Sequence, residues 1–172
     1  STAPKAIFML RHKGIGHPTN VETNECNGKI FWYGISAIIV LAVILRIISL
    51  DSIPIWIDEG FSYSAAIQSW TQLWSHTAYY ETHPVAWYSI LKLWLFLGDS
   101  EFVLRLLPVI TGLAAIAVTG VAGRALAGSY CGLFAAWLMC LAPFQISQAQ
   151  NLRPYSFVVL ATAITLAAAI TI

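Results

Sequence analysis

The chain of 172 residues is 58% hydrophobic and only 10% charged, which excludes an ordinary soluble domain and indicates an integral membrane protein. Its formal net charge of +1 argues against nucleic-acid binding through bulk charge and gives no preference for an acidic substrate. The three cysteines show no CxxC spacing, so neither a disulfide framework nor a zinc site is indicated.

The polar residues 1–29 are expected to form a loosely held tail. They carry several cations, which the positive-inside tendency keeps in the cytoplasm. Residues 30–50 form the first predicted span, because about 20 apolar residues match a hydrocarbon core about 30 Å thick. No small-residue cleavage site follows this span, so we interpret it as a retained anchor.

Residues 51–101 are expected to form an outer loop that contains two short helices. Five of the seven tryptophans lie in this stretch, and tryptophan prefers the membrane interface. The first helix is predicted near residues 60–74. The second is predicted over 85–97, where Pro84 can open a helix and Gly98 can close it.

The second of these helices carries an apolar stripe at helical spacing. The stripe predicts a helix that lies on the bilayer surface with this face toward the lipid. Its members are Trp87, Leu91, Trp94 and Leu95.

Three more spans are predicted after the outer loop, over about 102–126, 130–143 and 154–172. With the tail in the cytoplasm, alternation places the outer loop and the polar stretch 144–153 on the same outer face. The fold class is therefore an all-α, multi-pass membrane bundle of the plasma membrane. Small residues in the second span are expected to let helices approach closely, namely Gly112, Gly120 and Gly123. The last apolar run reaches Ile172 without a polar cap, so we expect an amino-terminal part of a longer protein.

Two adjacent carboxylates beside a predicted span require an explanation, because removing a charged group from water costs free energy unless the group is paired or hydrated. Asp58 and Glu59 can cap the helix that follows them, where the helix dipole favours negative charge. Alternatively they supply a general base, or a ligand for a hard divalent cation, in a water-filled cavity. The spacing alone leaves these roles open.

The cationic candidates also have two interpretations each. Arg46, near the end of the first span, either has a carboxylate or phosphate partner or reaches the headgroups. His83 is either a hydrogen-bonded surface group or a phosphate contact. Arg153 and Tyr155, at the start of the last apolar run, form either an interfacial anchor or a grip for phosphate.

Three stretches carry a pattern in a fixed order: LRIISLDSIPIWIDEGFSYSAA, THPVAWYSILKLWLFLGDSEFVLRLLPVITGL and LAPFQISQAQNLRPYS. An arginine, a WxDE, an HP, a GDSEFxLRLLP and an RPY follow one another across residues 41–160. In this combination the chain resembles the amino-terminal third of the membrane glycosyltransferases of family 39 type. That family includes aminoarabinose transferases and protein mannosyltransferases.

The resemblance implies a GT-C fold, a multi-span helical bundle with two interfacial helices in the first outer loop. It implies transfer of a hexosyl or pentosyl group from a polyprenyl-phosphate donor to an acceptor hydroxyl or phosphate, with inversion. Asp58 matches the position of the family's catalytic acid, where it would act as general base, and Glu59 is its neighbour. The expected partners are the lipid-linked donor, an acceptor and membrane lipids. The leaving phosphate needs cationic or polar contacts on the outer side, for which the candidates are His83, Lys92, Arg153 and Tyr155.

The chain departs from the family pattern in two places. Many relatives have SQEARPY or SQELRPY where this chain has AQNLRPY, so Asn151 stands where a glutamate is common. Gln150 and Asn151 are therefore further site candidates, and a metal or acceptor held by that glutamate would be held differently here. Val85 replaces the second proline of HPP, which affects helix entry.

Two other functions stay open at this stage. A transporter or flippase-like protein would line a path with its intramembrane charges. A catalytically inactive GT-C scaffold would keep the fold without the chemistry, which Asn151 favours. The clustering of the acids in one outer loop, and not at mid-span, favours an interfacial enzyme over a transporter.

Overall fold

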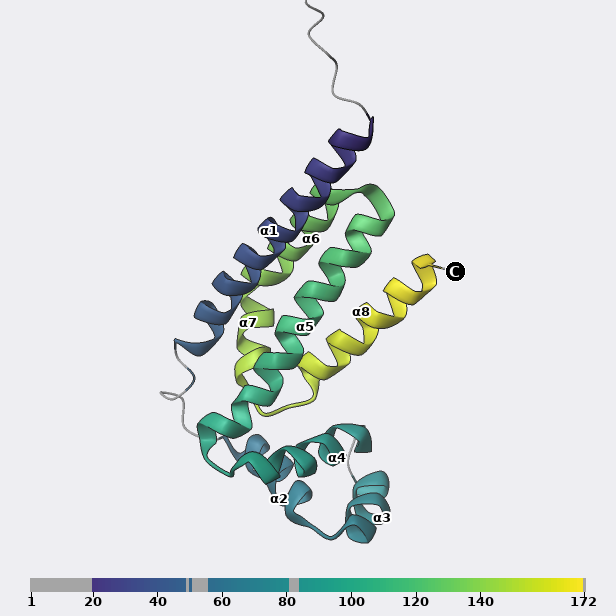
Figure 1. Ribbon diagram of the computed structural model, residues 1–172. Helices are drawn as coiled ribbons and strands as arrows, with labels where there is room; N and C mark the ends of the chain where they lie inside the picture. Colours follow the sequence, from purple (N-terminus) through teal and green to yellow (C-terminus); the bar gives the residue numbers. More distant parts are fainter. Residues whose placement is uncertain (1–19, 49, 51–55, 81–83, 172) are drawn as a thin grey trace, which may run out of the picture.

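The computed structural model describes residues 20–48, 50, 56–80 and 84–171, and this part of the chain is all-helical. Figure 1 shows two units, a bundle of long helices and a small layer of short helices that covers one end of it. The bundle helices are α1 (Asn20–Ile47), α5 (Glu101–Ala127), α6 (Ser129–Leu141), α7 (Pro143–Gln150) and α8 (Tyr155–Thr171). The end layer consists of α2 (Ile57–Ile67), α3 (Trp70–Tyr80), α4 (Val85–Trp94) and the 3-10 turn η1 (Leu95–Leu97).

Two helices of the described chain are long and apolar enough to cross a membrane, Gly28–Ile47 within α1 and all of α5. Helices α6 and α7 together form a third candidate, which is bent by 60° at their junction. Pro143 explains this break, because proline lacks an N–H and favours the first turn of a new helix. The last apolar helix, α8, has 17 residues and is shorter than a standard span.

Several predicted boundaries differ from the observed ones. Helix α1 begins at Asn20, so the end of the predicted tail is already helical. The polar stretch expected as a loop over 144–153 is largely the helix α7. The helix expected near 60–74 is two helices, α2 and α3, separated at Gln68 and Ser69.

Small residues hold the bundle helices close together, as predicted. A Cβ atom on Gly120 would meet Cδ1 of Ile35 at 2.7 Å, and one on Gly123 would meet Cα of Gly132 at 3.0 Å. A Cβ on Gly132 would lie only 2.4 Å from the carbonyl oxygen of Gly120. The backbones of α5 and α6 therefore touch where glycine faces glycine, which is the usual packing device of membrane helices.

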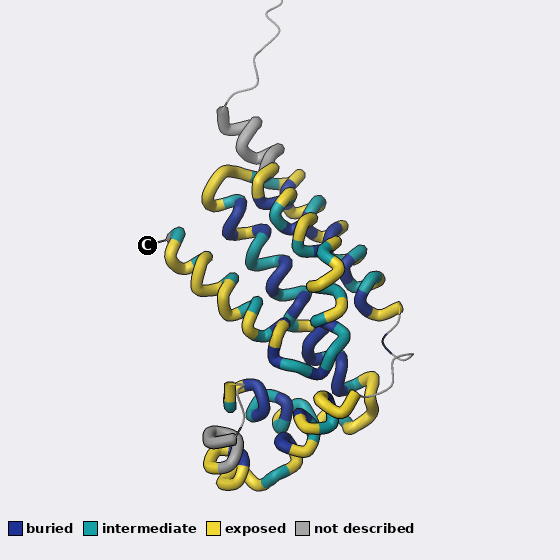
Figure 2. The backbone as a smooth tube through the Cα atoms, turned by 180° about the vertical axis from the view of Figure 1, so that it is seen from behind, coloured by how far each residue is buried: buried dark blue, intermediate teal, exposed yellow. Residues whose placement is uncertain are grey.

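The end layer has its own apolar core, and this core overturns the expected orientation of α4. Trp87 and Leu91 have no exposed surface, whereas the stripe was predicted to face lipid. They pack against residues from α2, α3, α5 and the α7–α8 connection, and Figure 2 shows this buried side of the layer facing the bundle. The stripe is thus a protein core and not a lipid contact, while Trp94 and Leu95 are partly buried beside it.

The end layer also carries large apolar side chains that are exposed. Its most exposed side chains are Phe96 (86%) and Ile57 (81%). Trp56, Phe61, Trp70, Trp74 and Leu97 are also at least 45% exposed. Large exposed apolar and aromatic side chains suit an interfacial layer at a membrane.

Candidate functional site

Glu59 joins three segments of the chain through its buried carboxylate. Oε2 lies 2.8 Å from Nη2 of Arg105 in α5 and accepts the backbone N–H of Trp56 at 3.1 Å. Oε1 accepts Nε of Arg105 at 3.3 Å and the backbone N–H of Leu152, in the α7–α8 connection, at 2.8 Å. The carboxylate therefore accepts four hydrogen bonds, which fills its normal capacity.

The ion pair is almost completely buried, since the side chains of Arg105 and Glu59 are 2% and 3% exposed. Arg105 also donates from Nη1 to the carbonyl oxygen of Leu50 at 2.9 Å. Burial by itself raises the pKa of the Glu59 carboxyl, but the hydrogen bonds from Arg105, Leu152 and Trp56 outweigh burial and lower that pKa below its ordinary value. Glu59 is consequently ionised at neutral pH and ties α2 to the bundle.

Asp58 makes a second, outer link between the same two segments. Its Oδ2 lies 3.0 Å from Nη2 of Arg153, the residue after Leu152. The Asp58 side chain is 68% exposed, whereas that of Arg153 is 15% exposed. The first turn of α2 and the α7–α8 connection are thus joined twice, by a buried link through Glu59 and by an accessible link through Asp58.

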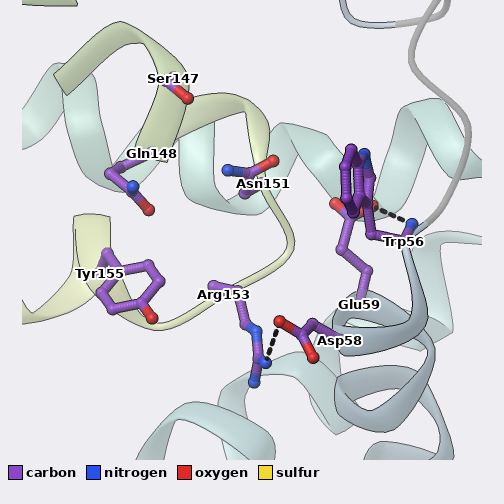
Figure 3. Close-up of a pocket in the computed structure, with 8 residues that line it drawn as sticks. All are labelled: Trp56, Asp58, Glu59, Ser147, Gln148, Asn151, Arg153 and Tyr155. Atoms are coloured by element: carbon purple, nitrogen blue, oxygen red, sulfur yellow. Dashed lines mark hydrogen bonds and ion pairs between the residues drawn. The ribbon is translucent and has the colours of Figure 1, made fainter. Parts of the chain in front are cut away.

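The outer link lies in a polar pocket of about 410 Å³ between the start of α2 and the segment from α7 to the start of α8. In Figure 3, Tyr155 and Gln148 lie on one side of the pocket, Trp56 and Glu59 on the other, and the Asp58–Arg153 pair between them. The remaining lining residues are Ser147 and Asn151. The pocket therefore combines an accessible carboxylate, a guanidinium and several neutral hydrogen-bonding groups.

The pocket gathers four of the predicted site residues besides Glu59: Asp58, Asn151, Arg153 and Tyr155. Lys92 is not among the residues that line it. Its ammonium donates to the carbonyl oxygens of Ala66, at 3.1 Å, and of Gln68, so it caps the end of α2. His83 lies outside the described residues.

Arg46 and Gln150 support the bundle behind the pocket. Arg46 is 1% exposed, so it does not reach the headgroups. It donates from Nη1 and Nη2 to the carbonyl oxygens of Cys140 (3.4 Å) and Met139 (3.4 Å), at the end of α6 where the break before Pro143 leaves carbonyls without helical partners. Gln150 donates in turn from Nε2 to the carbonyl oxygen of Arg46 at 3.1 Å. In the described part of the chain, carbonyls take the place of the expected carboxylate or phosphate partner of Arg46.

The prediction of the site omitted Arg105, Trp56, Gln148 and Ser147. A signal for Arg105 was present in the sequence, because an arginine in an apolar helix needs a carboxylate partner. Nothing in the sequence indicated that Gln148 or Ser147 would face the pocket, since a polar helix places such residues on any side.

Few side chains of the site could bind a metal ion. Across the described residues, no three His, Cys, Asp or Glu side chains come together as metal ligands would. Glu59 already accepts four hydrogen bonds, which leaves Asp58 as the accessible carboxylate of the pocket. These side chains do not form a protein-only cage for a divalent cation, which takes six or more oxygen ligands in the usual case.

Comparisons of this chain with protein-family models, with curated proteins and with solved structures find no match.

Proposed function

We propose that this chain is part of a membrane glycosyltransferase that takes a sugar from a polyprenyl-phosphate donor. The observation that carries the proposal is the Asp58–Arg153 pair, an accessible carboxylate beside a guanidinium at the edge of a membrane bundle. Such a transfer needs a base for the acceptor hydroxyl and a cation for the leaving phosphate, within one pocket. On this proposal the fold is of GT-C type, and the protein is a multi-pass protein of the plasma membrane.

The proposed base is Asp58. Its carboxylate accepts the proton of the acceptor hydroxyl as that oxygen forms a bond to the anomeric carbon of the sugar. The bond between the anomeric carbon and the phosphate oxygen breaks on the opposite face, and the lipid phosphate leaves with the electron pair. Asp58 suits this role because it is exposed to the pocket, whereas the oxygens of Glu59 are occupied.

The proposed phosphate contact is Arg153, with Tyr155 beside it. Tyr155 is the first residue of α8, and the N-terminus of a helix favours anions through its unpaired N–H groups and its dipole. A phosphate that approaches Arg153 competes with Asp58 for the guanidinium. Donor binding would therefore release the carboxylate at the moment when a base is required.

Glu59 and Arg105 act in this proposal as positioning residues. Glu59 holds the N–H of Leu152, whose chain neighbour is Arg153, and it is itself the chain neighbour of Asp58. The buried ion pair thus fixes the separation between the base and the phosphate contact. A shift of about 1 Å in such a geometry can cost about 100-fold in rate.

The test is a transfer assay with the full-length protein in proteoliposomes and a polyprenyl-phosphate donor whose sugar is labelled. We expect Arg153→Gln to raise the KM for the donor by about tenfold or more, the scale of one charge-assisted hydrogen bond. Lys29→Gln is the matched control, because it also removes a cation, from an exposed position that does not line the pocket, and it should leave KM unchanged. Absence of transfer from lipid-linked sugars in the wild-type protein, or use of a soluble sugar nucleotide instead, would contradict the proposal.

A further inference from the structure

Three side chains of the polar pocket have unused hydrogen-bonding capacity. They are Ser147 and Gln148 of α7 and Asn151, the residue that follows α7. None of the three side chains has a hydrogen-bond partner among the described residues, and no dashed line reaches them in Figure 3. Oε1 of Gln148 is moreover buried, and a buried acceptor without a donor is unfavourable. A ligand that donates a hydrogen bond to this wall of the pocket is therefore favoured.

The chemistry of this wall suits the hydroxyl groups of a sugar. A side-chain amide both donates and accepts hydrogen bonds, as does a serine hydroxyl, and sugar hydroxyls do the same. Trp56, which is 68% exposed, adds an aromatic surface on the other side of the pocket, where it can cover the apolar C–H face of a sugar ring. The volume of about 410 Å³ falls within the range of about 300–1,000 Å³ that is usual for small-molecule sites.

The charged side chains that line the pocket are already engaged. Glu59 is paired with Arg105 and accepts four hydrogen bonds. Asp58 and Arg153 neutralise each other at 3.0 Å. During transfer as proposed above, Asp58 takes the proton of the acceptor and Arg153 contacts the donor phosphate. None of the described residues that line the pocket then offers a free charge to the sugar.

A charge on the sugar would interfere with the Asp58–Arg153 pair. An ammonium group would bind the carboxylate of Asp58 and occupy the proposed base. A carboxylate group would bind Arg153 and compete with the donor phosphate. The neutral side chains of Ser147, Gln148 and Asn151 do not supply a counter-charge, and a charged group that leaves water without one loses free energy.

From this arrangement we infer that the pocket takes a neutral, polyhydroxylated sugar and discriminates against sugars that carry an ammonium or a carboxylate group. Gln148 and Asn151 are the specificity-determining residues in this inference. The inference rests on the proposed function and names the class of sugar that the lipid donor carries.

The experiment measures displacement of a radiolabelled polyprenyl monophosphate from the full-length protein in phosphatidylcholine nanodiscs. The competitors are polyprenyl-phosphate glucose, glucosamine and glucuronic acid, which share one ring and differ in charge. We expect the glucose lipid to compete about tenfold or more better than either charged lipid, the scale of one charge left without a partner. Equal competition by the three lipids, stronger competition by a charged one, or no displacement by any of them would overturn the inference.

Two pairs of substitutions test the named residues. Asn151→Asp adds a carboxylate to the pocket, so it should improve competition by the glucosamine lipid relative to the glucose lipid by about tenfold. Gln148→Met removes the unpaired acceptor and should weaken competition by the glucose lipid by about fivefold, the scale of one hydrogen bond. Gln145→Glu and Gln145→Met are the matched controls, because Gln145 lies on α7 but does not line the pocket. Equal effects at the pocket and control positions would contradict the assignment.

The result can be separated from the proposed function, because displacement does not require transfer. If the wild-type protein transfers glucosamine from its lipid donor as readily as glucose, the inference fails and the transferase stands. If the glucose lipid is preferred in binding but no sugar is transferred from any lipid donor, the selectivity of the pocket stands and the transferase proposal fails.

Discussion

Replacing Glu59 by Gln tests the buried link that fixes the site. The substitution preserves the shape of the side chain but removes its charge, and it leaves Arg105 buried with no counter-charge from position 59. Breaking one partner of a buried ion pair costs about 3–5 kcal/mol. Glutamine also presents one carbonyl oxygen where the carboxylate accepts from Arg105, Leu152 and Trp56, so part of that hydrogen bonding is lost as well.

The free energy of unfolding can be measured by denaturant titration in bicelles for Glu59→Gln, Arg105→Gln and the double variant. Once Glu59→Gln has removed the counter-charge, the additional Arg105→Gln change should cost little, because it removes the stranded charge. We therefore expect a coupling free energy of more than about 1 kcal/mol between the two positions. Asp99→Asn, an exposed change of the same type, should stay within about 0.5 kcal/mol of the wild type. Additive effects of Glu59→Gln and Arg105→Gln would refute the reasoning.

The same pair predicts a pH dependence. The pKa of Glu59 is lowered in the folded protein, chiefly because its hydrogen bonds outweigh the opposing effect of burial. Its contribution to stability is therefore present above the unfolded value of about 4.3 and is lost as the pH falls through the lower folded value. The difference in the free energy of unfolding between the wild type and Glu59→Gln should be constant from about pH 6 to 8, where the Glu59 carboxyl is ionised in both states. This difference should become smaller as the pH falls below about 4.3. A gap that stays constant throughout the acid range would count against the ion pair.

The remaining predictions concern packing and use the same unfolding measurement. Leu91→Ala creates a cavity in the core of the end layer and should lower the free energy of unfolding by about 2–5 kcal/mol. Leu97→Ala, at a 66% exposed position, should lower it much less. Similar losses for the two variants would contradict the burial of the α4 stripe. Gly132→Ala should destabilise the bundle, because its Cβ would lie 2.4 Å from a carbonyl oxygen of α5. Gly60→Ala should stabilise α2 by about 0.5–1 kcal/mol, because its Cβ would meet nothing within 4 Å. Equal effects of the two glycine changes would contradict the close contact of α5 and α6.

Most helices could be located from the sequence, because the length of an apolar run and the proline or glycine at its ends are local signals. Pro84 and Gly98 bound the segment of α4 and η1 as predicted, and Gly98 has a φ of 143° that favours glycine. The break between α2 and α3 was missed although it has a local signal. Ser69 and Gln72 exchange hydrogen bonds as a capping box, Oγ of Ser69 accepting from the N–H of Gln72 and Oε1 of Gln72 accepting from Ser69.

The orientation of α4 and the composition of the site depend on contacts between distant segments. An apolar stripe predicts that one face of a helix is shielded from water. The periodicity does not indicate whether lipid or protein shields that face. Leu91 belongs to one buried cluster with Leu104, Leu107 and Leu152, which lie in or after α5. Likewise, the spacing of Asp58 and Glu59 could not indicate which carboxylate meets Arg105 and which meets Arg153.

The most direct measurement of the central claim is the single-turnover rate of sugar transfer by Asp58→Asn at saturating lipid donor. Asparagine keeps the shape of the side chain and removes the proton acceptor, so the full-length variant should fold, bind polyprenyl phosphate and transfer sugar about 100-fold or more slowly than the wild type. A wild-type rate in the Asp58→Asn protein, with donor binding intact, would contradict the account and reduce Asp58 to a structural partner of Arg153.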